Sequence, residues 1–226
     1  MQSLAGLSGR GEGKTTFLTN LSLTIAQTGA KVLCISSDLR RPTVAKSFGL
    51  DEHNGFIELL TGTITLDQAI RSVSDLMLGA MPLEDIVKTP GIENLYILPS
   101  GHSRLNPAEI LNPRDIQNLN KQLRTRFDFI LYDSPPVLPV TDASILAPHM
   151  DALIIVYETG RTSKEALLRT KVQLVSIGAK IMGIVLNNAK PNTEALTTYP
   201  YYYRQDAQYC KRSILPRMKW QRHEKT

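Results

Sequence analysis

Cysteine is scarce in this sequence, and neither a long aliphatic run nor a leader segment is evident. The two cysteines, Cys34 and Cys210, cannot form a disulfide framework, which favours a reducing compartment such as the cytoplasm. The longest aliphatic run, residues 152–156, is far too short to cross a bilayer. The first residues do not combine a charged region with an apolar stretch, so no signal peptide is expected. These absences point to a globular protein of the cytoplasm.

The net charge of +5 is concentrated at the C-terminus. Residues 204–226 contain seven lysines or arginines against Asp206 and Glu224, a difference of five that equals the whole excess. The first 203 residues are therefore neutral, with 19 basic and 19 acidic side chains. A neutral globule without basic residues interleaved with stacking aromatics argues against nucleic acid as a partner. The basic tail is either a solvated end or a segment that contacts anionic lipid headgroups.

Short apolar strands alternate with segments of helical length along the chain. This order predicts an α/β fold with a mostly parallel β-sheet and helices on both faces. We expect one domain at residues 1–196 and a flexible, basic, tyrosine-rich tail at residues 197–226. The expected strands are residues 4–7, 32–36, 95–98, 129–132, 152–157 and 181–186. The expected apolar face of the first helix consists of Phe17, Leu18, Leu21 and Ile25.

Residues 58–71 and 75–88 align with each other at a spacing of 17 residues. We interpret them as a local duplication of a short helix pair, since one tandem copy cannot form a solenoid.

A glycine-rich loop, SGRGEGKT at residues 8–15, lies between the first expected strand and the first expected helix. Its glycines allow successive backbone N–H groups to point inward, and the following helix directs its positive end at the same place. Lys14 then reaches the outer phosphates, and the Thr15 hydroxyl is placed to bind Mg²⁺. Ser8 stands where the G-x-x-x-x-G-K-[ST] pattern has its first glycine. The predicted nucleotide-binding residues of this loop are Gly9, Arg10, Gly11, Glu12, Gly13, Lys14, Thr15 and Thr16.

Two aspartates are expected beside this loop. Asp133 follows the apolar run at residues 129–132, and Asp38 follows the strand at residues 32–36. Parallel α/β sheets bind ligands at the carboxyl ends of their strands, where both residues would lie. Either aspartate alone would be as well explained by a turn cap, but together with the loop they predict a Mg²⁺ site of Thr15, Asp38 and Asp133.

Several further segments resemble one family, the bacterial tyrosine autokinases (BY-kinases) that work with polysaccharide co-polymerases. GEGKTT at 11–16 resembles their Walker A motif, DLRRP at 38–42 the latter half of their second aspartate motif, and FDFILYDSPPVLPVTDA at 127–143 their Walker B region. The other similar segments are LPSG at 98–101, NPAEIL at 106–111, VLN at 185–187 and TTYPYYY at 197–203.

The resemblance implies an ATP-dependent protein-tyrosine kinase that phosphorylates its own tail in trans, within a homo-oligomer. Its cofactors would be ATP and Mg²⁺, with Lys14, Asp38 and Asp133 as catalytic residues and Asn187 against the adenine. It would regulate the chain length and export of capsular or exopolysaccharide with a transmembrane co-polymerase, at the inner face of the plasma membrane. The implied phosphate acceptors are Tyr199, Tyr201, Tyr202, Tyr203 and Tyr209.

The sequence departs from the family at Ser36, where the second motif usually has its first aspartate, thought to deprotonate the acceptor tyrosine. A serine hydroxyl cannot act as a general base near neutral pH, and losing such a base costs roughly 10²–10⁴-fold in rate. Transfer by positioning and charge alone still allows a slow kinase. Ser36 also suits a non-catalytic, nucleotide-binding regulator of polysaccharide export.

A partition or septum-positioning ATPase is the third alternative. Those proteins carry an additional lysine four residues before the glycine of Gly-Lys, where this chain has Gly9. They also lack a tyrosine-rich end, so both features argue against this class.

Overall fold

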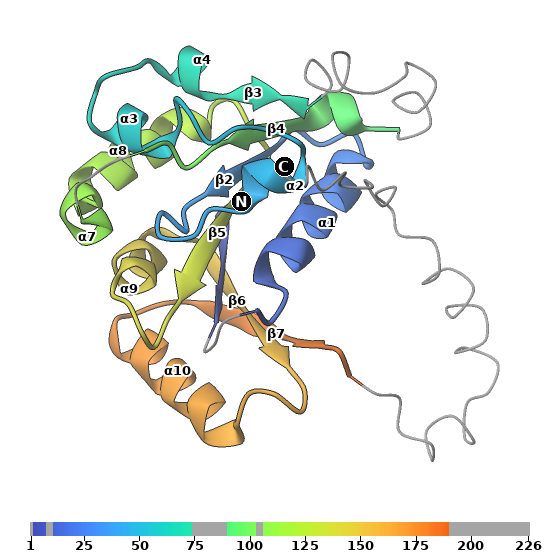
Figure 1. The fold of residues 1–226 in the computed structure, drawn as a ribbon, viewed down its shortest axis with the longest axis vertical. Coiled ribbons are helices and arrows are strands. Elements are labelled where there is room, and N and C mark those ends of the chain that lie inside the picture. The colour runs from blue at the N-terminus through green and yellow to red at the C-terminus, as the bar shows by residue number, and fades with distance from the viewer. Residues whose placement is uncertain (1, 8–10, 74–89, 103–105, 190–226) are drawn as a thin grey trace, which may run out of the picture. The chain divides into compact units, whose positions relative to one another are not determined.

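The computed structural model describes residues 2–7, 11–73, 90–102 and 106–189. Within them lies a seven-stranded sheet with the strand order β3-β4-β2-β5-β1-β6-β7 (Figure 1). Neighbouring strands pair in parallel, except that β3 pairs antiparallel with β4. The predicted α/β fold with a mostly parallel sheet is therefore confirmed. The strands are β1 (Gln2–Leu7), β2 (Val32–Ser36), β3 (Arg71–Ser72), β4 (Leu95–Leu98), β5 (Phe129–Pro136), β6 (Ala152–Glu158) and β7 (Ile181–Asn187).

Helices lie on both faces of the sheet. α1 (Lys14–Ala26) covers one face, whereas α8 (Pro113–Leu123), α9 (Asp142–Leu146) and α10 (Lys164–Ser176) lie on the other (Figure 1). The connection through α1 runs toward β3 and the other three run toward β7, so right-handed crossovers put them on opposite faces. The shorter helices are α2 (Val44–Ser47), α3 (Phe56–Leu60), α4 (Leu66–Ala69) and α7 (Pro107–Ile110), with 3₁₀ turns η1 (Ile92–Asn94) and η2 (Ala147–His149).

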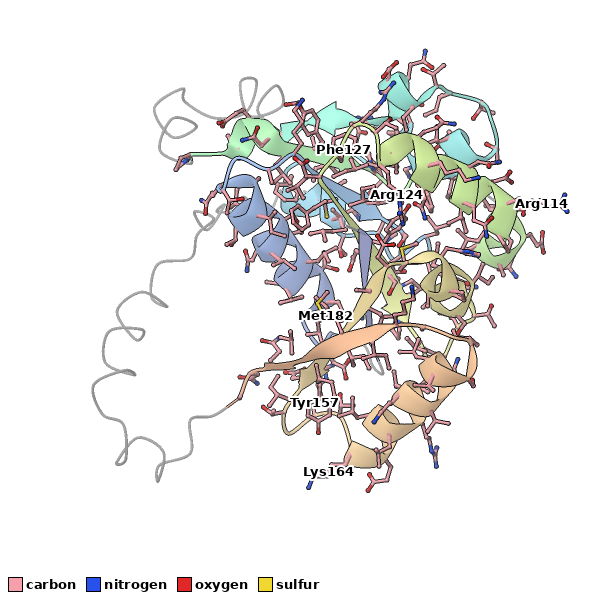
Figure 2. The ribbon with its side chains drawn as sticks, turned by 180° about the vertical axis from the view of Figure 1, so that it is seen from behind. Arg114, Arg124, Phe127, Tyr157, Lys164 and Met182 are labelled. Atoms are coloured by element: carbon pink, nitrogen blue, oxygen red, sulfur yellow. The ribbon has the colours of Figure 1, made fainter. Side chains whose placement is uncertain are left out.

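The core fills the space between the sheet and its helices (Figure 2). Every residue of β2 is buried, as expected for a strand covered on both faces. Tyr132 on β5 is fully buried, packs edge-on against Phe56 and donates its hydroxyl hydrogen bond to Asn120 Oδ1 at 2.5 Å. This buried hydroxyl therefore has the partner that its burial requires.

The buried face of α1 differs from the predicted one. Phe17, Leu21 and Ile25 are only half-buried. The fully covered residues are Leu18, Thr19, Ser22, Leu23 and Ala26. The small Ser22 and Ala26 let the helix approach the sheet closely, and the Ser22 hydroxyl is satisfied by the Leu18 carbonyl at 2.5 Å. A prediction from the spacing of large apolar residues misses this face, because three of its residues are serine, threonine or alanine.

The far edge of the sheet is formed by β7, whose side chains alternate between two environments. Val185 packs against the core on the side of α10. Met182, Ile184 and Leu186 alternate with that covered set and are 54%, 46% and 59% exposed. Figure 2 shows Met182 on this outer strand.

The described residues up to Asn188 belong to one compact unit. The predicted tail at 197–226 lies outside the described residues, so its boundary stays a prediction. The first copy of the proposed duplication forms α3 and α4, while the second copy also lies outside the described residues. None of the helices in the described part combines the length and apolar character needed to cross a membrane.

Replacing Leu33 by alanine should lower the free energy of unfolding by about 2–5 kcal/mol, because Leu33 is fully buried in β2 and a cavity would remain. Leu168→Ala is the matched control on the outer side of α10, where the side chain is 59% exposed, and should change it by less than about 0.5 kcal/mol. Urea titrations followed by circular dichroism measure both. Equal losses in the two variants would contradict this packing.

Candidate nucleotide-binding site

The glycine loop leads from β1 into α1. Gly13 immediately precedes the helix with φ of 83°, a left-handed conformation that favours glycine. A Cβ atom at this residue would also lie 2.3 Å from Asn187 Nδ2. The N–H groups of the first turn of α1 therefore open toward the loop, as an anion site requires. Gly9 and Arg10 lie outside the described residues, so their predicted contacts stay predictions.

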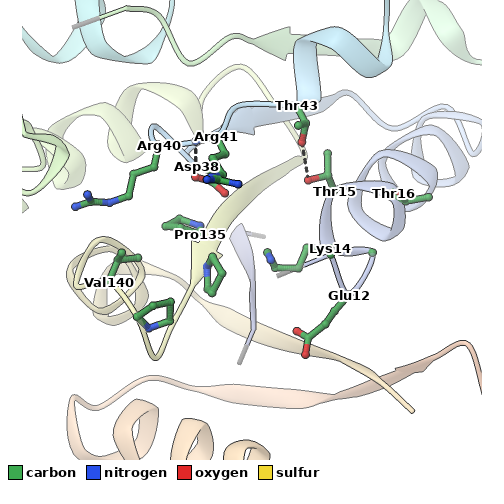
Figure 3. Close-up of a pocket in the computed structure, with 14 residues that line it drawn as sticks. Glu12, Lys14, Thr15, Thr16, Asp38, Arg40, Arg41, Thr43, Pro135 and Val140 are labelled. Atoms are coloured by element: carbon green, nitrogen blue, oxygen red, sulfur yellow. Dashed lines mark hydrogen bonds between the residues drawn. The ribbon is translucent and has the colours of Figure 1, made fainter. Parts of the chain in front are cut away.

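Lys14 is the first residue of α1, and its side chain is largely buried and points into the pocket (Figure 3). Burial lowers its pKa, while the carboxyl groups of Asp133, Asp38 and Glu12 act in the opposite direction. The three acidic groups thus offset part of the cost of burying the ammonium group. The lysine is thus held where it can meet the oxygens of a phosphate.

A chain of hydrogen bonds joins α1 to the end of β5. The Thr43 hydroxyl donates to Thr15 Oγ1 at 3.1 Å, and the Thr15 hydroxyl donates to Asp133 Oδ2 at 2.7 Å. The other carboxyl oxygen, Asp133 Oδ1, is buried and has no hydrogen-bond partner among the described residues. A hydroxyl and a buried carboxyl oxygen with unused capacity fit the oxygen donors that Mg²⁺ takes. Asp133 and Thr15 therefore lie together, as the sequence predicts.

Burial raises the pKa of Asp133 to about 7, with the nearby Asp38 adding to the rise and the Thr15 hydrogen bond and Lys14 opposing it. A buried carboxylate without a fixed cation is costly, and the group is protonated more readily as a result. Within the described residues, no group of three or more histidine, cysteine or acidic side chains forms a ready-made metal cage. Mg²⁺ commonly uses only one or two protein carboxylates together with substrate phosphates, so this donor set suits it.

Asp38 lies in the turn after β2. Its Oδ1 accepts a hydrogen bond from the Arg41 backbone N–H at 3.0 Å, which closes a turn of the kind that aspartate favours. Burial raises the pKa of Asp38, whereas the backbone hydrogen bond from Arg41 and the charge of Lys14 lower it. Asp38 thus serves the turn and lines the pocket at the same time.

Ser36 ends β2 directly beside Asp133, because the two residues are paired in the β2–β5 register. Its side chain is fully buried, and its hydroxyl has no hydrogen-bond partner in the part of the chain that the structure describes. The position that usually carries an aspartate in the family is thus a neutral hydroxyl on the strand next to Asp133. It adds no second negative charge next to Asp133.

The ends of β6 and β7 brace the glycine loop from the opposite side. Asn187 Nδ2 donates to the Glu12 carbonyl at 2.9 Å, and the Thr162 hydroxyl contacts the buried Glu12 carboxyl group. Arg161 Nη1 reaches the Gly11 carbonyl at 3.2 Å. Asn187 therefore contacts the loop backbone and does not line the pocket, so its predicted contact with adenine stays a prediction.

Arg40 and Asp142 form an ion pair that the sequence analysis did not find. The Arg40 guanidinium binds the fully buried Asp142 carboxylate through Nε at 2.7 Å and Nη2 at 3.1 Å. Arg40 Nη2 also donates to Asn106 Oδ1 at 3.3 Å. All three belong to the segments quoted for the family resemblance, but no local pattern connects residues so far apart in the chain.

The pocket has a volume of about 550 Å³ and extends from the glycine loop to the turn after β5 (Figure 3). Its lining residues are Gly11, Glu12, Gly13, Lys14, Thr15, Thr16, Asp38, Arg40, Arg41, Thr43, Pro135, Pro136, Pro139 and Val140. The predicted loop residues from Gly11 to Thr16 and Asp38 are thus brought together. The predicted acceptor tyrosines, Tyr199 to Tyr203 and Tyr209, lie outside the described residues.

The buried Asp133 predicts a specific dependence of stability on pH in the absence of Mg²⁺. Its pKa rises from 3.8 to about 7 on folding, so the folded state binds more protons between these values and is destabilised as the pH rises through them. The loss should approach about 1.4 kcal/mol per pH unit. Asp133→Asn removes this contribution, so its unfolding free energy relative to wild type should increase from pH 4 to pH 7 in urea titrations. Parallel pH curves for the two proteins would contradict the assignment.

The chain is similar in sequence and in structure to known P-loop proteins. The chain matches the model of an AAA domain over residues 6–181. The tyrosine-protein kinase YwqD of Bacillus subtilis (strain 168) is 32% identical over 196 residues, which cover 87% of this chain and 75% of that protein. The crystal structure of the VpsO kinase domain is 32% identical with a TM-score of 0.71, covering 84% of this chain and 85% of that one.

A more distant similarity extends to the septum site-determining protein MinD of Pyrococcus horikoshii OT3, solved with Mg-ADP. It is 26% identical with a TM-score of 0.63, covering 87% of this chain and 75% of that chain. The kinases are the more similar group in both sequence and structure. Together with the P-loop, the paired Thr15 and Asp133 and the matching family model, they establish that the chain belongs to the bacterial tyrosine-kinase (BY-kinase) family of P-loop proteins.

Proposed function

We propose that this chain is an ATP- and Mg²⁺-dependent protein-tyrosine kinase whose acceptors are the C-terminal tyrosines of another copy. The observation that carries the proposal is the hydrogen bond from Thr15 to the buried Asp133, next to Lys14 and Asp38. Such a group of hydroxyl, carboxyl and ammonium functions suits the outer phosphates of a nucleotide. Relatives such as YwqD are named tyrosine-protein kinases, which supports the same activity here.

Each residue has a defined role in this proposal. The loop amides from Gly11 to Thr16 and the Lys14 ammonium bind the β- and γ-phosphates. Thr15, Asp133 and Asp38 hold Mg²⁺ directly or through water. The ion, when bound, neutralises charge on the phosphate oxygens. Asn187 holds the loop through the Glu12 carbonyl.

The transfer itself needs an acceptor oxygen in line with the bond that breaks. The phenol oxygen of the incoming tyrosine forms a bond to the γ-phosphorus, and the bond from that phosphorus to the oxygen of ADP breaks. The phenol proton leaves to Asp38 or to a water molecule. Ser36, which pairs with Asp133 in the β2–β5 register, cannot take this proton, because a serine hydroxyl is not a general base near neutral pH. The reaction is therefore expected to depend on positioning and charge, and to be slow.

The second candidate is a nucleotide-binding regulator that transfers little phosphate. The observation that favours it is the same buried Ser36 hydroxyl, for which residues 2–7, 11–73, 90–102 and 106–189 offer no hydrogen-bond partner. A septum-type ATPase is not favoured, although MinD shares the fold, because the lysine characteristic of that class is replaced by Gly9.

In either case we place the chain in a system for making capsular or exopolysaccharide, as the family resemblance implies. It would act at the inner face of the plasma membrane with a transmembrane co-polymerase, and the basic residues of the tail would contact anionic lipid. A homo-oligomer would present the tail of one copy to the site of the next.

Lys14→Met should reduce phosphate incorporation on tyrosine by about 10²–10³-fold, because it removes the cation that meets the outer phosphates. Lys121→Met, on the exposed side of α8, is the control and should retain wild-type labelling. Incubation with radiolabelled ATP and Mg²⁺, followed by mass spectrometry of the tail, measures both. Wild-type protein as unlabelled as Lys14→Met would refute the kinase proposal.

Ser36→Asp should increase autophosphorylation, by up to roughly 10²–10⁴-fold if a general base is what the site lacks. Ser36→Asn is the matched control, since it has nearly the same shape without a base and should give no gain. Initial rates of tyrosine labelling separate the two. An equal response of both variants would mean that Ser36 does not limit the reaction.

A further inference from the structure

The pocket has a second side, formed by the last residues of β5 and the turn that leads from them to α9. Pro135, Pro136, Pro139 and Val140 line it opposite the glycine loop (Figure 3). None of these four side chains is polar, in contrast to Lys14, Thr15 and Asp38 on the other sides. We call these four residues the proline wall.

The proline wall lies beyond the outer end of the phosphate site. Lys14 extends from the glycine loop into the space between the loop and the wall (Figure 3). A P-loop lysine meets the β- and γ-phosphates, so the wall faces the end of the triphosphate where an acceptor must enter. The nucleoside leaves the loop at the other end of the phosphate chain.

The wall is held in place by the core and by an ion pair. Val137 lies within the turn and is fully buried in the core cluster. Asp142, at the start of α9, is fully buried and binds the Arg40 guanidinium through both carboxyl oxygens. Arg40 belongs to the same turn as Asp38, so this ion pair ties the two sides of the space together. The surface is therefore preformed, which lowers the cost of binding.

The chemistry of this space suits a flat apolar ring with one polar end. Proline rings and a branched aliphatic side chain offer apolar contact, as in the packing of prolines against aromatic residues. Lys14 and Asp38 offer polar contact at the inner end. A tyrosine has this character, because it combines an apolar ring with a hydroxyl at its far end. Serine and threonine have a hydroxyl without the ring, and phenylalanine has the ring without the hydroxyl.

We propose that the proline wall binds the ring of the acceptor tyrosine presented by a second copy of the chain, and that Val140 is a specificity-determining contact. This inference rests on the proposed kinase function and adds the acceptor side of the same site. Tyrosine is preferred over serine because only its ring covers the wall while its hydroxyl reaches the γ-phosphate.

The test mixes two forms of the full chain. A tagged Lys14→Met chain serves as the acceptor, and the transferring chain is wild type, Val140→Asp or Leu138→Asp. Leu138 is the matched control, since it lies in the same turn and is exposed but does not line the pocket. Transfer rates are measured against the concentration of the acceptor chain and, separately, of ATP.

Val140→Asp should raise the KM for the acceptor chain by at least about tenfold, because a charge replaces an apolar contact. The KM for ATP should stay within about twofold of wild type, and Leu138→Asp should change neither value. An unchanged acceptor KM in Val140→Asp overturns the inference. An equal rise in the KM for ATP also overturns it, because the wall would then hold the nucleoside.

A binding measurement separates this inference from the kinase proposal. If the wild-type chain transfers no phosphate to tyrosine, the kinase proposal fails. The proline wall can still be tested by measuring how a fluorescent peptide of residues 197–204 binds to the chain in the presence of Mg²⁺ and ADP. A control peptide has every tyrosine replaced by alanine. The inference is supported if the tyrosine peptide binds more tightly than this control, and if Val140→Asp removes that difference while Leu138→Asp keeps it. Equal binding of the two peptides overturns it.

Discussion

The site depends on a carboxyl group that the fold keeps away from water. Asp133 is almost completely buried in the second half of β5, with the Thr15 hydroxyl on one oxygen and no partner among the described residues on the other. Three parts of the fold meet near this carboxyl group: the first turn of α1, the turn that carries Asp38, and the paired strands β2 and β5. A well-packed apolar residue at the same position would stabilise the empty protein more. Such a costly buried carboxyl group is typical of a functional site, in keeping with the metal-binding role proposed for Asp133.

Two sets of side-chain contacts hold the rest of the site around Asp133. On one side, Arg40 and Asp142 connect the turn after β2 to the start of α9. On the other, Asn187 and Thr162 connect the ends of β7 and β6 to Glu12 in the glycine loop. All of these contacts lie at the carboxyl ends of the parallel strands, where strand order and crossover handedness bring distant segments together. The site is thus built by the topology of the sheet as much as by any single motif.

The sequence predicts the parts of this arrangement that have a local pattern. β2 and β4 have the predicted bounds, and Lys14, Thr15, Asp38 and Asp133 meet as expected, because strand ends and a P-loop are readable from neighbouring residues. The two-residue β3 is too short to leave a pattern, and the buried face of α1 contains Ser22 and Ala26 in place of large apolar residues. Arg40 and Asp142 are separated by 102 positions, so only the folded chain pairs them.

The position of β1 in the sheet has a consequence for how the protein opens. β1 carries the glycine loop and is flanked by β5 and β6, whereas β3 and β7 form the edges. Amide hydrogens of a central strand exchange with solvent only through large-scale unfolding, while edges open through small local fluctuations. The glycine loop is therefore attached to a strand of slow exchange. The C-terminal tail continues from β7, an edge strand with exposed Met182, Ile184 and Leu186. The chain thus joins its glycine loop to a strand paired on both sides and its C-terminal residues to a strand at the edge of the sheet.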